Sequence, residues 1–150
     1  MFGGGILCQD GAPQEKYHID RPTHPTIMKN VVYYNGSIRA GISSNGSGSE
    51  TMPVKIIGNH VYKSGLTGIG LQKGSVGIIE DNMVAESNLS GIAVNDSTAL
   101  RLNLNKVTGT KEAPGFVVVN GGKVRKMIGN ASDSNKGPRF MKGRDEIVGE

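Results

Sequence analysis

Residues 59–71 read Asn59-His-Val61-Tyr-Lys-Ser64 and, three residues later, Gly68-Ile69-Gly-Leu71. The same pattern returns as Asn82-Met-Val84-Ala-Glu-Ser87 with Gly91-Ile92-Ala-Val94, and again as Asn105-Lys-Val107-Thr-Gly-Thr110 with Gly115-Phe116-Val-Val118. A looser copy starts at Asn30, a decayed copy starts at Asn130, and a half copy, Gly5-Ile6-Leu-Cys8, opens the chain. Self-similarity at a fixed period indicates a protein built from stacked repeats.

The asparagines that begin the copies mark the period. They follow one another at steps of 29, 23, 23 and 25 residues, at Asn30, Asn59, Asn82, Asn105 and Asn130. An apolar residue lies three positions before each of them, and apolar residues alternate with other residues on both sides. Alternation with a period of two is typical of strands. Each copy therefore predicts short strands separated by an asparagine turn and a glycine turn.

Stacking explains why these residue types recur. If each copy forms one coil, equivalent residues lie above one another at the strand spacing of about 4.8 Å. Val61, Val84 and Val107 then form one buried column, and the asparagines form a hydrogen-bonded ladder. We expect the glycines before the next strand to adopt positive φ; they are Gly41, Gly68, Gly91 and Gly115. The pattern predicts an all-β parallel β-helix, a solenoid of about five to six coils over residues 1–137, with 138–150 as a charged C-terminal tail or cap.

Composition narrows the class of protein. The chain has 150 residues, of which 23 are glycine, and its single cysteine allows no intrachain disulfide. No apolar run is long enough to span a membrane, and the first residues lack the pattern of a signal peptide. The formal net charge is +4, with basic residues concentrated after Gly122. No stripe of basic and aromatic residues predicts nucleic-acid binding, whereas an acidic polysaccharide is a plausible partner for the basic end.

The repeat resembles that of the pectin-lyase-like superfamily of right-handed parallel β-helices, most clearly over residues 27–120. The superfamily includes pectate lyases, polygalacturonases, alginate and chondroitin lyases, epimerases and phage tailspikes. The resemblance implies a right-handed coil, polysaccharide binding or processing, and an extracellular or cell-surface location. The paired-aspartate and Gly-His-Gly signatures expected of polygalacturonases are missing, so whether the chain is an enzyme stays open. The alternative function is a structural or assembly module of a larger surface or fibre protein.

The first candidate site is an insertion between Asp10 and Thr26. It contains His18, Asp20, Arg21 and His24, whose side chains can serve as acids, bases or cations. A lyase needs a base and a cation that neutralises the substrate carboxylate, and a histidine with Arg21 fits those roles. An ordinary polar loop and a metal site are the alternatives. Because the spacing matches no strong ligand motif, no metal or cofactor is predicted.

The second candidate site is a polar strip where the strand after each glycine ends. Aligned by coil, its two positions read Gln9, Asn45, Gln72, Asn95, Val119 and then Asp10, Gly46, Lys73, Asp96, Asn120. The side chains of such a strip could form hydrogen bonds with the hydroxyl groups of a sugar. The candidate substrate-binding residues are therefore Asp10, Gln72, Lys73, Asn95, Asp96 and Asn120. The alternative is that these residues are polar only because strand ends are exposed to solvent.

The last expectation concerns the two terminal coils of the solenoid. Terminal coils expose unpaired backbone groups that invite pairing with another chain. We expect the C-terminal tail to flank the last coil, and the exposed coil ends to allow a homo-oligomer.

Overall fold

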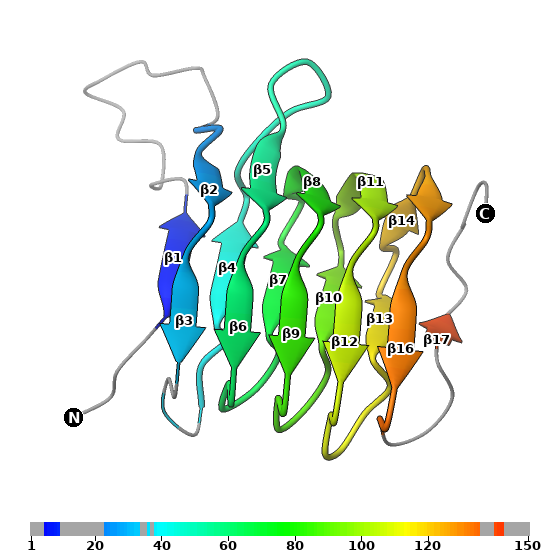
Figure 1. Ribbon diagram of the computed structural model, residues 1–150. Coiled ribbons are helices and arrows are strands. Elements are labelled where there is room, and N and C mark those ends of the chain that lie inside the picture. Colours follow the sequence, from blue (N-terminus) through cyan, green and yellow to red (C-terminus); the bar gives the residue numbers. More distant parts are fainter. Residues whose placement is uncertain (1–4, 10–22, 34–35, 37, 136–139, 143–150) are drawn as a thin grey trace.

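The computed structural model describes residues 5–9, 23–33, 36, 38–135 and 140–142. The chain winds through three sheets in turn, so that each sheet gains strands coil by coil (Figure 1). The predicted fold class, an all-β right-handed parallel β-helix, is confirmed. The asparagines from Asn30 to Asn130 span four turns, slightly fewer than the predicted number of coils.

Each coil passes through sheets A, B and C in that order, and all neighbouring strands are parallel. Sheet A consists of β1 (Ile6–Gln9), β4 (Ile42–Asn45), β7 (Ile69–Gln72), β10 (Ile92–Asn95), β13 (Phe116–Val119) and β17 (Phe140–Lys142). Sheet B consists of β2 (Thr26–Met28), β5 (Val54–Ile57), β8 (Val76–Glu80), β11 (Thr98–Asn103), β14 (Lys123–Val124) and β15 (Met127–Ile128). Sheet C consists of β3 (Val31–Tyr33), β6 (His60–Tyr62), β9 (Met83–Ala85), β12 (Lys106–Thr108) and β16 (Ala131–Asp133).

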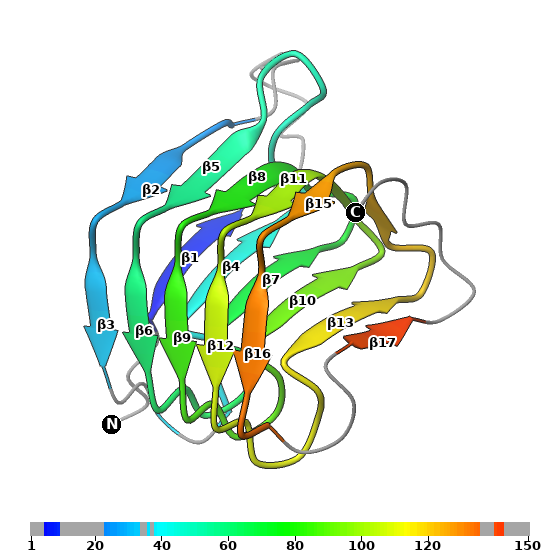
Figure 2. The same ribbon diagram turned by 45° about the vertical axis from the view of Figure 1, so that its right-hand side comes forward.

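The predicted register is confirmed residue by residue. Val61, Val84 and Val107 are partners on adjacent strands of sheet C, and all three are fully buried. In sheet A the column of Ile42, Ile69, Ile92 and Phe116 is likewise buried. One core therefore runs along the axis of the solenoid between the three sheets (Figure 2).

The asparagine ladder, Asn30, Asn59, Asn82, Asn105 and Asn130, lies at the turn between sheets B and C. The backbone N–H and the Nδ2 of each member donate to the Oδ1 of the next member, at 2.9–3.1 Å. The Nδ2 groups also donate to strand carbonyls, for example from Asn82 to Ile56 and Glu80. The predicted ladder is therefore confirmed, and it satisfies backbone groups that the turn would otherwise bury unpaired.

The prediction of positive φ for Gly41, Gly68, Gly91 and Gly115 is wrong. None of these four glycines has positive φ, and they are needed for space instead. A Cβ at Gly68 would lie 2.2 Å from Cγ1 of Val84 on the next coil. Positive φ occurs at other corners and is adopted there by non-glycine residues such as Lys73, Asp96 and Asn120.

Residues 46–53 form a long connection from β4 to β5. It projects beyond the neighbouring connections (Figure 1), and Glu50 in it forms an ion pair with Arg125 on a distant coil. Of the larger insertion, residues 10–22 lie outside the described part. β17 in the C-terminal region pairs with β13, while residues 136–139 and 143–150 are outside the described part. Over the residues described, no helix has the length and apolar character needed to cross a membrane.

Candidate functional site

A groove of about 820 Å³ crosses the outer face of sheet A. Its floor follows the second residue of each strand, which points away from the core. This row consists of Leu7, Ser43, Gly70, Ala93 and Val117, which are partners on adjacent strands. Three of the five are serine, glycine or alanine, so the middle of the sheet carries no large side chain. The sheet is therefore hollowed on its outer face from β1 to β13.

One wall of the groove consists of side-chain amides. Gln9, Asn45, Gln72 and Asn95 are the last residues of successive strands, and each is the partner of the next. Oδ1 of Asn45 is buried and accepts no hydrogen bond from the described residues. Oδ1 of Asn95 accepts a hydrogen bond of 2.8 Å from Nδ2 of Asn120. The wall offers hydrogen-bond donors and acceptors on β1, β4, β7 and β10, whereas Val119 holds the equivalent position on β13.

The opposite wall is aliphatic. Ile38, Leu66 and Leu89 lie in the connections that lead from sheet C into sheet A, and they line the groove together with Ala113. Their side chains are exposed, by 55%, 41% and 37% for the three larger residues. Leu66, Leu89 and Ala113 hold the same place in successive coils, because the N–H of Leu89 donates to the carbonyl of Leu66 and that of Ala113 to the carbonyl of Leu89. Arg39 holds this place on the coil before them, next to Ile38, so the apolar residues form a short strip beside a cation. Such a strip beside convergent polar groups is typical of a ligand site.

The charged residues that line the described part of the groove are cationic. They are Arg39, in the connection before β4, and Lys73, directly after β7. Lys73 has positive φ, as have its equivalents Gly46, Asp96 and Asn120 on other coils. The described lining includes no carboxylate. The described part of the lining therefore has a weakly basic character.

The structure brings only part of the predicted polar strip into the groove. Gln72, Lys73 and Asn95 line it, and their role in substrate binding stays a prediction. Asp96 and Asn120 are exposed at the corner beyond the strand ends, where Asn120 contacts Asn95. Asp10 lies outside the described residues. The aliphatic wall was not predicted, although the leucines two residues before Gly68 and Gly91 were a signal for it.

The predicted catalytic cluster is not assembled within the described structure. His24 is exposed in the segment before β2 and does not line the groove. His18, Asp20 and Arg21 lie outside the described residues. Their proposed roles stay predictions.

Cys8 occupies the inward column of sheet A, with Ser44 and Leu71 on the next coils. It is partly buried against the core, and desolvation by this burial raises the pKa of its thiol. A raised pKa disfavours the thiolate, which is the nucleophilic and metal-binding form. Cys8 is therefore a packing residue.

Side chains with imidazole or thioether groups, which can act as metal ligands, lie close together at one place on sheet C. His60 and Met83 are partners on adjacent strands, and Oη of Tyr62 lies 3.6 Å from Sδ of Met83. The rings of His60 and Tyr62 meet edge to face, with centroids 6.4 Å apart. Lys106 is the next residue in this row and is the partner of Met83 on the adjacent strand.

The comparisons with known proteins identify a family. Residues 11–141 match the family model described as "Periplasmic copper-binding protein (NosD)". The chain belongs to the NosD family. No curated protein and no solved structure matches the sequence of this NosD-family chain.

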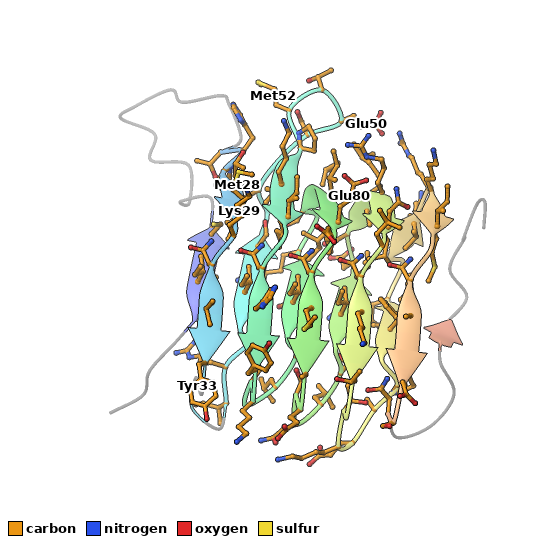
Figure 3. The ribbon with its side chains drawn as sticks, in the orientation of Figure 1. Met28, Lys29, Tyr33, Glu50, Met52 and Glu80 are labelled. Atoms are coloured by element: carbon orange, nitrogen blue, oxygen red, sulfur yellow. The ribbon has the colours of Figure 1, made fainter. Side chains whose placement is uncertain are left out.

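The described residues do not fit a copper centre. Imidazole and thioether groups suit copper, but in the described part no three histidine, cysteine, aspartate or glutamate residues gather in one place. His60 and Met83 supply two donors beside a cationic lysine. Met28, at the end of β2, and Met52, in the β4–β5 connection, project from separate elements (Figure 3). In this NosD-family chain the groove of sheet A is the better-built site.

Proposed function

We propose that the chain is a binding module that holds an extended polysaccharide along the groove of sheet A. One observation carries the proposal: a wall of amides on four successive strands faces a partly aliphatic wall, across a floor whose middle consists of small residues. The ligand that fits such a site is itself a repeating chain with both hydroxyl groups and apolar C–H faces.

The spacing of the coils favours a sugar chain over a peptide. Neighbouring strands lie about 4.8 Å apart, which is close to the length of one hexopyranose unit. Successive sugars can then contact equivalent amides on successive coils. Amides suit this role, since they both donate and accept hydrogen bonds, as hydroxyl groups do. An extended peptide advances only about 3.3 Å per residue and would leave this register.

The charges favour an acidic polysaccharide. Arg39 and Lys73 both lie in the groove lining, and no described carboxylate opposes them. Exposed ion pairs contribute only about 0–1 kcal/mol and are screened by salt. We therefore expect a modest preference for acidic over neutral chains of the same geometry, and a preference that weakens as salt is added.

The proposal is limited to binding. Cleavage of a polysaccharide needs a general acid or base held near the scissile bond. The described lining offers amides, aliphatic groups and two cations, but no carboxylate or imidazole. The lyase, hydrolase or epimerase activity of the wider superfamily is therefore not proposed for this groove.

A glycan array followed by calorimetry with the best ligand tests the proposal. Ala93→Trp places a large ring on the floor of the groove, while Ala85→Trp makes the same change on the outer face of sheet C. We expect Ala93→Trp to weaken binding at least tenfold and Ala85→Trp to leave it unchanged. An array without a polysaccharide ligand, or equal losses in both variants, would overturn the proposal.

A further inference from the structure

The centre of the groove floor is covered by a side chain. Gly70 faces outward from β7, yet it is buried and is not part of the described lining, whereas its strand partners Ser43 and Ala93 are. A Cβ at Gly70 would lie 3.3 Å from Nε2 and 3.9 Å from Cγ of Gln72. The side chain of Gln72 therefore folds back along its own strand and covers Gly70.

This arrangement depends on a pairing of two residue types. Residues two apart on a strand lie on the same face, so Gln72 and Gly70 are neighbours on the outer face of sheet A. On both neighbouring strands the floor residue has a Cβ and the amide is one methylene shorter. These pairs are Ser43 with Asn45 and Ala93 with Asn95. On β7, a glycine that leaves space occurs together with a glutamine long enough to fill it.

The amide of Gln72 has a second polar group beside it. Ser43 is the partner of Gly70 on β4, so its hydroxyl lies one strand away, at a spacing of about 4.8 Å. Gln72 and Ser43 both line the groove, and neither side chain forms a hydrogen bond with the described residues. An amide and a hydroxyl can each donate and accept. The middle of the floor therefore presents two adjacent polar groups that are available to a ligand.

We propose that Gln72 and Ser43 form a subsite that determines specificity, by binding two neighbouring hydroxyl groups of one sugar in an acidic polysaccharide. The inference rests on the proposed polysaccharide binding and deepens it. Two hydroxyls on neighbouring ring carbons supply donors and acceptors that match the amide and the serine hydroxyl. Gly70 is a positioning residue, because it provides the space in which the amide of Gln72 lies.

The subsite distinguishes free sugars from substituted ones. O-acetylation of a hydroxyl removes its donor and adds an ester group at the place where the amide of Gln72 covers the floor. The amide and the hydroxyl of Ser43 then lose hydrogen bonds to water without gaining equivalent bonds to the ligand, which lowers affinity. We expect the parent to bind the free form of an acidic oligosaccharide about fivefold or more tightly than its O-acetylated form.

Calorimetry with acidic oligosaccharides in free and O-acetylated forms tests the subsite. Gln72→Ala removes the amide, whereas Gln72→Asn keeps an amide at the strand end that is too short to cover Gly70. Both variants should bind the free probe about fivefold or more weakly than the parent, and the preference for the free form should shrink. Asn88→Ala, which removes an amide outside the described lining, should retain the parent's affinity and preference.

Gly70→Ala tests the positioning role without changing either polar group. Gly70 does not have positive φ, so alanine fits the backbone, while its methyl group displaces the amide of Gln72. The preference for the free probe should shrink although the melting temperature stays that of the parent. In a Gln72→Ala background the same change should have no further effect on binding. Losses that add in the double variant would contradict the positioning role.

The possible results separate this inference from the proposed function. A parent that binds no polysaccharide, or whose binding is unaffected by Ala93→Trp, removes the binding groove and the subsite together. A parent whose binding is lost in Ala93→Trp but that binds both probe forms equally well overturns the subsite alone. Parent-like affinity and preference in the folded Gln72→Asn variant does the same, because the amide over Gly70 is then not needed.

Discussion

At the scale of single residues, Asn82 illustrates how the ladder holds a turn in the interior. Its side chain is 2% exposed and accepts hydrogen bonds from the N–H and Nδ2 of Asn59. Its own Nδ2 donates to strand carbonyls and to Asn105. One side chain therefore pairs groups from three successive coils, and its loss would leave several of them buried without partners.

We expect Asn82→Ala to lower the free energy of unfolding by about 3 kcal/mol or more, because each stranded buried group costs about 1–3 kcal/mol. Urea denaturation measures the change. Asn88→Ala is the matched control, since Asn88 is half-buried and its side chain makes no hydrogen bond with the described residues. Equal midpoints for the two variants would show that the ladder is not needed for stability.

Removing a buried serine hydroxyl should raise the free energy of unfolding, whereas Asn82→Ala should lower it. The side chain of Ser87 is fully buried, and its Oγ has no hydrogen-bond partner in the described structure. Replacement by alanine removes a desolvated hydroxyl, so Ser87→Ala should raise the free energy of unfolding by about 1 kcal/mol.

The control for Ser87→Ala is Ser75→Ala. Oγ of Ser75 is also buried but bonds to the carbonyls of Ser44 and Gln72 and accepts from the N–H of Ser47. Its removal should lower stability by about 1–2 kcal/mol. Thermal melts of the pair that move in the same direction would contradict this account of the two hydroxyls.

At the scale of elements, the glycine before each strand of sheet A decides how closely the coils approach. A Cβ at Gly91 would lie 2.0 Å from Cγ1 of Val107 and 2.7 Å from the carbonyl oxygen of Gly115. The glycine column and the valine column of sheet C therefore depend on each other. Sequence alone showed that both columns exist, but the contact between them depends on how the sheets close around the core.

Gly91→Ala should lower the free energy of unfolding by about 3 kcal/mol, because the methyl group has no space and the coils must separate. The comparison is Gly74→Ala, where φ is +78° and a Cβ would meet open space. That variant should lose only about 1 kcal/mol, from the left-handed backbone. Denaturant titration of both variants separates the two effects, and a larger loss at Gly74 would contradict the packing argument.

At the scale of the whole molecule, the repeat predicted the fold better than the site. The period placed Val84 and Ile92 in their columns, because stacked coils turn sequence spacing directly into contact. It also placed Gln72 and Asn95 side by side. The aliphatic wall of Leu66 and Leu89 was missed because it lies in connections, whose direction the strand period does not determine. The groove exists only where these connections meet the outer face of sheet A.

The central claim is that this groove binds an extended polysaccharide coil by coil. The most direct measurement is calorimetry of the parent protein with acidic oligosaccharides of increasing length, taken from the best ligand on the array. The lining runs from β1 to β13, five strands at about 4.8 Å spacing, or about 19 Å from first to last. We predict that affinity rises with each added sugar until the ligand spans these strands and then levels off, and that Ala93→Trp abolishes the rise. An affinity that does not depend on length, or a rise that persists in Ala93→Trp, would contradict the claim.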